Sequence, residues 1–197
     1  MVSLTENESR TIEFLIRNFF NDYNINQLSR ELKVSPMGIY KILKKLENQS
    51  FLISNKQGNN IFYKINYESK EALDACIFAL TEKKTTPYIR SWINDLEKLK
   101  EKTKLAILFG SILRKGKEAR DIDVLLVFDK EDFNDIERII KEINKIRTKR
   151  IHAIYQTKQD LVNNIKIKDK AILEEIRIGV ILWGRDILVE AIKNGQS

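Results

Sequence analysis

Apolar residues recur at intervals of three and four through the first fifty positions, and then the pattern becomes strand-like. The helical intervals predict three helices within 5–50, of which the second spans about 25–32 and the third 36–49. Two short runs rich in β-branched and aromatic residues, 51–54 and 61–65, flank a Gly/Asn turn at 56–60. Such runs around such a turn predict a β-hairpin.

The ends of these helices carry capping signals. Thr5 or Asn7 can cap the first helix, and Ser35 can cap the third, with Pro36 at its first helical position, where a missing N–H is harmless. The first helix is expected to bury a stripe of five apolar residues. They are Ile12, Leu15, Ile16, Phe19 and Phe20.

Residues 69–104 are predicted to be helical, with a break at 85–87 where Thr86 can cap a new helix that starts at Pro87. That helix has an apolar stripe at intervals of three and four. Its members are Ile89, Trp92, Ile93, Leu96 and Leu99. The stripe must pack either on the C-terminal part of the chain or against a second copy.

The C-terminal part alternates between strand and helix patterns. An apolar run from Leu105, the Gly110-Ser111 pair, a basic stretch and Asp121-Ile122-Asp123 lead into a second apolar run that ends at Phe128. A helix at 132–147, a strand at 150–157, a helix at 171–178, a strand at 180–183 and a helix at 185–193 follow. This order predicts an α/β unit.

Composition limits the class of protein. The chain of 197 residues has a net charge of +7, and no apolar run reaches the length of about 20 residues that a membrane helix needs. The N-terminal segment lacks a secretory pattern. The single cysteine, Cys76, rules out an intramolecular disulfide framework and is expected in the core. Together these features favour a cytoplasmic protein.

Basic residues gather in two stretches. Residues 33–64 hold six lysines against one acid, Glu47, and residues 141–170 hold nine basic residues against three acids. Such patches favour binding of polyanions. A solvated lysine-rich surface is the alternative interpretation, particularly for the second stretch.

Asp121 and Asp123 are the strongest chemical signal. Alternate residues of a strand point to the same side, so the two carboxylates are expected side by side and repel each other without a cation. Oxygen ligands of this kind suit Mg²⁺. Gly110 lets a phosphate approach the backbone, and Ser111 at a helix start offers N–H groups to the anion.

This combination resembles the minimal nucleotidyltransferase domains of the DNA polymerase β-like superfamily, whose pattern is Gly-Ser after a strand and Asp-x-Asp on the next strand. The resemblance covers about 105–184 and implies transfer of NMP from an NTP, with Mg²⁺ or Mn²⁺. By this resemblance Asp121 and Asp123 are the catalytic metal ligands. The residues expected to bind the nucleotide are Gly110, Ser111, Arg114, Lys115 and Arg120.

One element of the family pattern has no counterpart. Active members usually add a third carboxylate from a following strand, and the matching segment here, 150–157, contains no acid. His152 lies in that segment and can face the site as a ligand or base, although a lone strand histidine is more often structural.

The N-terminal pattern of three helices and a hairpin resembles a winged helix-turn-helix domain. The resemblance implies that the third helix enters the major groove of double-stranded DNA and that the hairpin tip touches phosphate. The expected contacts are Met37, Tyr40, Lys41, Lys44, Lys45 and Lys56. Protein contacts alone are the alternative use of such a domain.

The predicted organisation is therefore two domains and a connector. Residues 1–68 form a winged helix-turn-helix domain, 69–104 a helical connector that can dimerise, and 105–197 an α/β nucleotidyltransferase-like domain with a mixed sheet.

Two functions follow from this organisation. The first is a DNA-tethered enzyme that transfers NMP to an acceptor, which in this superfamily is a small molecule, a protein hydroxyl or a nucleic-acid end. The second is a transcriptional regulator whose degenerate nucleotidyltransferase domain senses a nucleotide. Small nucleotidyltransferase domains also act in toxin–antitoxin pairs, and the sequence selects no acceptor, NTP or DNA site.

Overall fold

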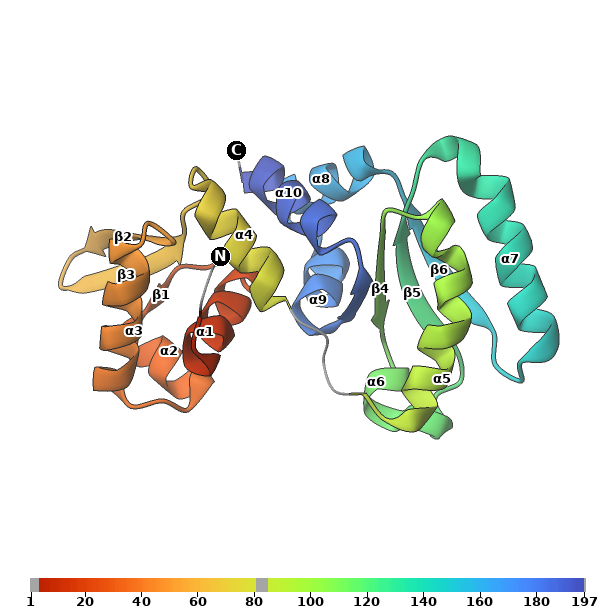
Figure 1. The fold of residues 1–197 in the computed structure, drawn as a ribbon, viewed down its shortest axis with the longest axis horizontal. Coiled ribbons are helices and arrows are strands. Elements are labelled where there is room, and N and C mark those ends of the chain that lie inside the picture. The colour runs from red at the N-terminus through yellow and green to blue at the C-terminus, as the bar shows by residue number, and fades with distance from the viewer. Residues whose placement is uncertain (1–3, 81–84, 197) are drawn as a thin grey trace. The chain divides into compact units, whose positions relative to one another are not determined.

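The computed structural model describes residues 4–80 and 85–196 and divides into two compact units, Met1–Thr81 and Glu82–Ser197 (Figure 1). Each unit has its own buried apolar core. None of the helices in the described ranges has the length and apolar content that crossing a bilayer requires.

The first unit has the winged helix-turn-helix architecture predicted from the sequence. A three-stranded antiparallel sheet in the order β1-β3-β2 packs with four helices. The elements are α1 (Glu6–Arg17), β1 (Tyr23–Asn24), α2 (Ile25–Leu32), α3 (Pro36–Asn48), β2 (Leu52–Gln57), β3 (Asn60–Ile65) and α4 (Lys70–Ala79).

Local capping chemistry sets where these helices begin. The Thr5 side chain accepts a hydrogen bond from the Glu8 N–H in a reciprocal capping box, so Thr5 and not Asn7 is the cap of α1. The Ser35 hydroxyl accepts from the Gly38 N–H, and Pro36 occupies the first turn of α3, as predicted.

The end of α1 differs from the prediction. The helix stops at Arg17, and Asn18 occupies its C-cap, where the side-chain amide donates to the Phe14 carbonyl. Phe19 and Phe20 therefore lie in the turn after the helix, although Phe19 is still buried there. Hydrophobic spacing alone extended the helix because burial continued after the helical backbone had ended.

The predicted connector, 69–104, is shared by the two units. Helix α4 packs against α1 in the first unit and buries Cys76, as expected for a core cysteine. Helix α5 (Pro87–Leu96), capped by Thr86, and the 3₁₀ segment η1 (Glu97–Lys102) belong to the second unit. The three-part division at residues 68 and 104 stays a prediction.

The second unit is built on a four-stranded mixed sheet in the order β6-β5-β4-β7, in which only β5 and β6 are parallel. Its strands are β4 (Leu105–Phe109), β5 (Ile122–Val127), β6 (Ile151–Gln156) and β7 (Val180–Trp183). Its remaining helices are α6 (Ile112–Lys115), η2 (Gly116–Glu118), η3 (Lys130–Asp132), α7 (Phe133–Ile146), α8 (Lys158–Lys166), α9 (Lys170–Ile178) and α10 (Arg185–Gln196).

Helix α8 was missed by the sequence analysis. A capping box formed by Thr157 and Asp160 begins it, and Leu161 and Ile165 are its buried residues. With only two buried apolar positions in nine residues, its amphipathic pattern is weak, and the capping pair was the stronger signal.

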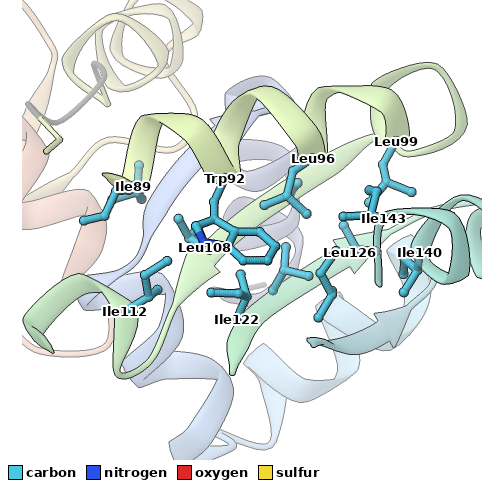
Figure 2. Close-up of a cluster of buried hydrophobic side chains, with 14 of the residues drawn as sticks. Ile89, Trp92, Leu96, Leu99, Leu108, Ile112, Ile122, Leu126, Ile140 and Ile143 are labelled. Carbon is cyan, nitrogen blue, oxygen red and sulfur yellow. The ribbon is translucent and has the colours of Figure 1, made fainter. Parts of the chain in front are cut away.

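The helices cover the two faces of this sheet separately: α5 and α7 lie on one side and α8, α9 and α10 on the other (Figure 1). On the first side the stripe of α5 packs on the strands, where Trp92 and Leu96 meet Leu108 and Leu126 (Figure 2). The stripe of the predicted connector helix thus packs on the C-terminal sheet, the first of its two expected partners.

Candidate functional site

The Gly110-Ser111 turn and Asp123 are neighbours because β4 and β5 pair antiparallel. Phe109, the last residue of β4, lies directly opposite Asp123 in the register. The chain between them, 110–121, forms a loop that contains α6 and η2. Residues that are far apart along this loop therefore meet at one end of the sheet.

Gly110 is required at this position for two reasons. Its φ is +79°, a left-handed conformation that strains any residue with a side chain. A Cβ there would also lie 2.0 Å from Asp123 Oδ2. Gly110 was expected to admit a phosphate, and in the structure this glycine makes room for the carboxylate of Asp123.

Strand register assigns Asp123 to the α9 face of the sheet. Directly paired residues project to the same side, so Asp123 shares a face with Phe109, and Leu125 shares it with Ile107. A Cβ on Gly179, at the end of α9, would lie 2.4 Å from Ile107 Cγ2, which shows that α9 packs on this face. The apolar cluster under α5 and α7 uses the alternate residues, including Leu108 and Val124.

His152 stands beside Asp123 on the next strand. The two residues are paired in the parallel register of β5 and β6, and Nδ1 of His152 lies 3.4 Å from Oδ1 of Asp123. The imidazole is 74% exposed and the carboxylate 19%. An exposed imidazole next to a shielded carboxylate can donate, accept or ligate.

The other predicted nucleotide residues lie around the same loop. Asp121 is exposed and precedes the first residue of β5 by one position. Ser111 is the N-cap of α6, which has only four residues, and its hydroxyl caps no backbone N–H of that helix. The exposed basic side chains of the loop are Arg114, Lys115 and Arg120.

Lys149 holds this loop through two hydrogen bonds. It was not singled out from the sequence. Its ammonium donates to the Lys117 carbonyl at 2.8 Å and to the Ala119 carbonyl. Lys149 follows α7 and precedes β6, so it ties the turn before β6 to the loop before β5. The sequence showed only one more lysine in a basic stretch.

Glu175 is the second residue that sequence reasoning missed. It lies on α9, is only 6% exposed, and its Oε2 has no hydrogen-bond partner among the described residues. Burial, followed by the negative charges of Asp169 and Asp123, raises the pKa of this carboxyl to about 7. Glu175 comes three residues after Ile172 and one before Ile176, so helical spacing places it on the buried stripe of α9. This spacing was the sequence signal that could have predicted its burial.

No three His, Cys, Asp or Glu side chains converge into a metal cage within the described ranges. This does not conflict with a Mg²⁺ site, because Mg²⁺ is usually held by one or two carboxylates together with waters and substrate phosphates. The carboxylates of Asp121, just before β5, and of Asp123, on β5, are oxygen donors of the required kind. The residues present therefore fit a divalent cation.

The predicted DNA contacts fall into two groups. On α3, Met37 and Tyr40 are 64% and 44% exposed, and Lys41 is exposed beside them, while Lys56 lies on the exposed hairpin. Lys44 is paired with Glu47 at 2.7 Å.

Lys45 is held by a residue of another helix. Its ammonium lies 2.8 Å from Oε1 of the buried Glu8 on α1. Desolvation acts to raise the pKa of Glu8, but hydrogen bonds from Lys45 and Thr5 with the lysine's charge outweigh it, and the net pKa is lowered. Lys45 therefore has a structural partner, whereas Lys41 has no ion pair with any residue that the structure describes.

The fold and the arrangement of these residues define the class: a winged helix-turn-helix unit joined to a nucleotidyltransferase-type α/β unit. Residues 92–187 match the family model described as "Polymerase beta, Nucleotidyltransferase". This segment contains β4, β5, the Gly-Ser turn and Asp-x-Asp, and it confirms the resemblance inferred from the sequence. The match starts within α5, which the structure also assigns to this unit.

Comparison with curated proteins gives no match. Among solved structures, Lactococcus lactis ZitR in complex with DNA is 14% identical, with a TM-score of 0.34 over 73% of this chain and 75% of that one. The structure described as a zinc-responsive MarR family member, Lactococcus lactis ZitR, is 16% identical, with a TM-score of 0.33 over 73% and 76%. Scores this low support no conclusion about function.

Proposed function

We propose that the C-terminal unit is a metal-dependent nucleotidyltransferase that transfers NMP from an NTP to an acceptor hydroxyl, and that the N-terminal unit binds double-stranded DNA. The observation that carries the enzymatic part is the packing of the Asp123 carboxylate against Gly110 in a domain of this family. That packing holds the acid next to the turn where the triphosphate is expected.

The reaction is a substitution at the α-phosphorus. The acceptor oxygen forms a bond to the α-phosphorus, the bond from that phosphorus to the bridging oxygen of the β-phosphate breaks, and pyrophosphate leaves. A bound Mg²⁺ or Mn²⁺ supplies positive charge that neutralises the triphosphate. Asp121 and Asp123 are the proposed ligands of this ion.

The chain's other residues have defined tasks in this proposal. Arg114, Lys115 and Arg120 on the 110–121 loop bind the phosphates of the leaving pyrophosphate, and Lys149 keeps that loop in place through its two carbonyl contacts. His152, exposed beside Asp123, accepts the proton of the acceptor hydroxyl.

The test uses the full chain with Mn²⁺ and each α-labelled NTP, offered proteins, nucleic-acid ends and small hydroxyl compounds as acceptors. We expect pyrophosphate release that Asp121→Asn with Asp123→Asn reduces to background. Asp129→Asn is the matched control, because Asp129 follows the opposite end of β5 and only pairs with Lys104 at the surface. Equal release from the wild type and the double variant would falsify the enzymatic proposal.

A nucleotide-sensing regulator is the second candidate, favoured by the lack of an acid on β6 and of a three-ligand cluster in the described part of the chain. In this case an NTP binds and changes the affinity for DNA but is not consumed. Fluorescence anisotropy with labelled DNA, with and without NTP, combined with the pyrophosphate assay, separates the two functions.

DNA binding has its own test. We expect Lys41→Ala and Tyr40→Ala to weaken binding of duplex DNA, and Lys41→Ala to reduce the salt slope by about one. Lys45→Ala, the same change on a lysine already paired with Glu8, is expected to have a smaller effect on DNA affinity. Identical anisotropy curves for all three variants and the wild type at low salt would contradict the proposed interface.

A further inference from the structure

A cavity of about 430 Å³ lies in the second unit between helix α5 and strand β7, at the edge of the sheet. Small-molecule sites usually have volumes of about 300–1,000 Å³, a mostly apolar lining and a few polar groups. Nothing in the proposed function uses this cavity. Asp123 lies on β5, two strands away, and projects to the other face of the sheet.

An irregularity in β7 shapes the apolar floor of this cavity. Ile181 and Trp183 pair with consecutive residues of β4, so Leu182 between them is an extra residue, a β-bulge. Strict alternation would put the side chains of Ile181 and Trp183 on the same side of the sheet. The bulge instead turns Trp183 to the α5 side, because its partner Ala106 belongs to the apolar cluster on that side.

Hydrogen bonds hold the indole of Trp183 in this position. Its Nε1 donates to the Thr103 hydroxyl at 3.0 Å, and that hydroxyl donates to the Leu99 carbonyl at 2.8 Å. The ring is half-buried and lines the cavity together with Leu182 and Ile93, the member of the α5 stripe that is only half-buried. A fixed aromatic ring that is partly uncovered can stack on another flat apolar group.

The polar wall of the cavity comes from α5 and η1 and has a positive net charge. Its charged residues have no ion pair within the described ranges; they are Arg90, Glu97 and Lys100. Glu97 and Lys100 are three residues apart in the 3₁₀ segment η1, where such side chains eclipse, so their opposite charges offset each other. Arg90 remains as the uncompensated cation, with the amide of Asn94 one turn further along α5.

We propose that this cavity binds a small organic anion with a flat apolar body. The body stacks on Trp183 between Ile93 and Leu182, and the acid group is bound by Arg90, whose planar donors match the oxygens of such a group. The site is separate from the proposed metal and nucleotide site, because the two lie on opposite faces of the sheet.

Two fluorescent dyes that differ in one charge test this site on the full chain. Anilinonaphthalene sulfonate has a flat apolar body with an anionic group, and phenylnaphthylamine has the same body without the charge. We expect the sulfonate dye to bind the wild type, and Arg90→Gln to weaken that binding by about tenfold, as for a lost hydrogen bond to a charged group. The neutral dye should bind both proteins equally.

Lys98→Gln is the matched control for charge. It removes one positive charge from η1, which continues α5, at an exposed residue that does not line the cavity. It should bind the sulfonate dye like the wild type. An equal loss in Lys98→Gln and Arg90→Gln would indicate attraction by overall charge and overturn the site, as would unchanged binding by Arg90→Gln.

A measurement on the wild type locates the bound dye. The chain has two tryptophans, so labelling with ¹⁵N-tryptophan gives two indole N–H signals, assigned by the one that Trp183→Phe removes. Trp183 lines the cavity, whereas Trp92 is 2% exposed in the apolar cluster. The sulfonate dye should shift the Trp183 signal and leave that of Trp92 nearly unchanged. A shift of neither signal, or a shift of Trp92 as large as that of Trp183, overturns the proposal.

Discussion

On the α5 and α7 side of the C-terminal sheet, strand residues such as Leu108, Val124 and Leu126 belong to a cluster of buried apolar side chains. On the α9 side, the same two strands carry Asp123 at one end, where its carboxylate lies against Gly110. The first face stabilises the unit by apolar packing, whereas the second face has a carboxylate in place of an apolar side chain at one end. Chemistry is expected where the apolar pattern is interrupted.

The largest expected effect comes from removing the main side chain of the apolar face. Trp92 is 2% exposed, and Trp92→Ala should lower the free energy of unfolding by about 3–5 kcal/mol through lost burial and the cavity it leaves. Urea unfolding of the full chain measures this. Ile146→Ala, which truncates a 70% exposed side chain on α7, is the control and should change stability by less than about 0.5 kcal/mol.

Gly110→Ala changes the other face of the sheet, next to Asp123. The new methyl would displace the Asp123 carboxylate, and we expect pyrophosphate release to fall by about a hundredfold, the usual effect of misplacing a catalytic group by about 1 Å. Gly116→Ala in the same loop has a φ of +53° but no atom within 4 Å of its Cβ. It should lose about 1–2 kcal/mol from backbone strain and keep its activity. Equal activity in both variants would remove the special role of Gly110.

Glu175→Gln should change how the free energy of unfolding depends on pH. Without metal, the folded chain keeps this carboxyl protonated up to about pH 7, whereas the unfolded chain releases the proton near 4.5. The folded state binds more protons in this window, so wild-type stability falls as the pH rises through it. Glutamine does not titrate, and the stability gained by Glu175→Gln should therefore be larger at pH 8 than at pH 5. Urea unfolding in EDTA at the two pH values measures it, and an equal difference at both would show that Glu175 titrates normally.

The smallest effect is expected for Arg147, whose guanidinium lies beside Trp92 of the apolar cluster. Arg147, the C-cap of α7, donates from Nε to Asp95 at 2.5 Å and from Nη2 to the Ser91 hydroxyl at 2.8 Å, and it lies 4.9 Å from the centre of the Trp92 ring. Arg147→Lys loses this planar fork and should lower the free energy of unfolding by about 1 kcal/mol, as for a typical hydrogen bond. No change in the urea midpoint would show that the fork contributes nothing to stability.

Elements fixed by neighbouring residues were predictable. The caps at Ser35 and Thr86 act over three residues, so spacing and capping chemistry located α3 and α5. The family match likewise confirms the nucleotidyltransferase fold, which the Gly-Ser and Asp-x-Asp pattern had indicated. The same local logic extended α1 too far, since Phe19 is buried but not helical.

Features that depend on distant contacts were not predictable from spacing. Glu175 is a buried residue of α9, which packs on β4, and Lys45 is turned to Glu8, which is 37 positions away. Lys149 reaches the 110–121 loop from the far end of α7. The functional roles assigned from the sequence to the residues of this site and to the DNA contacts all stay predictions. At the site these residues are Gly110, Ser111, Arg114, Lys115, Arg120, Asp121, Asp123 and His152.

The most direct test of the account is a crystal structure of the full chain with Mn²⁺ and a non-hydrolysable NTP, with the ion located by its anomalous signal. We expect one Mn²⁺ contacting carboxylate oxygens of Asp121 and Asp123, with the triphosphate at residues 110–111. A manganese peak remote from Asp123, or a triphosphate bound elsewhere on the unit, would contradict it.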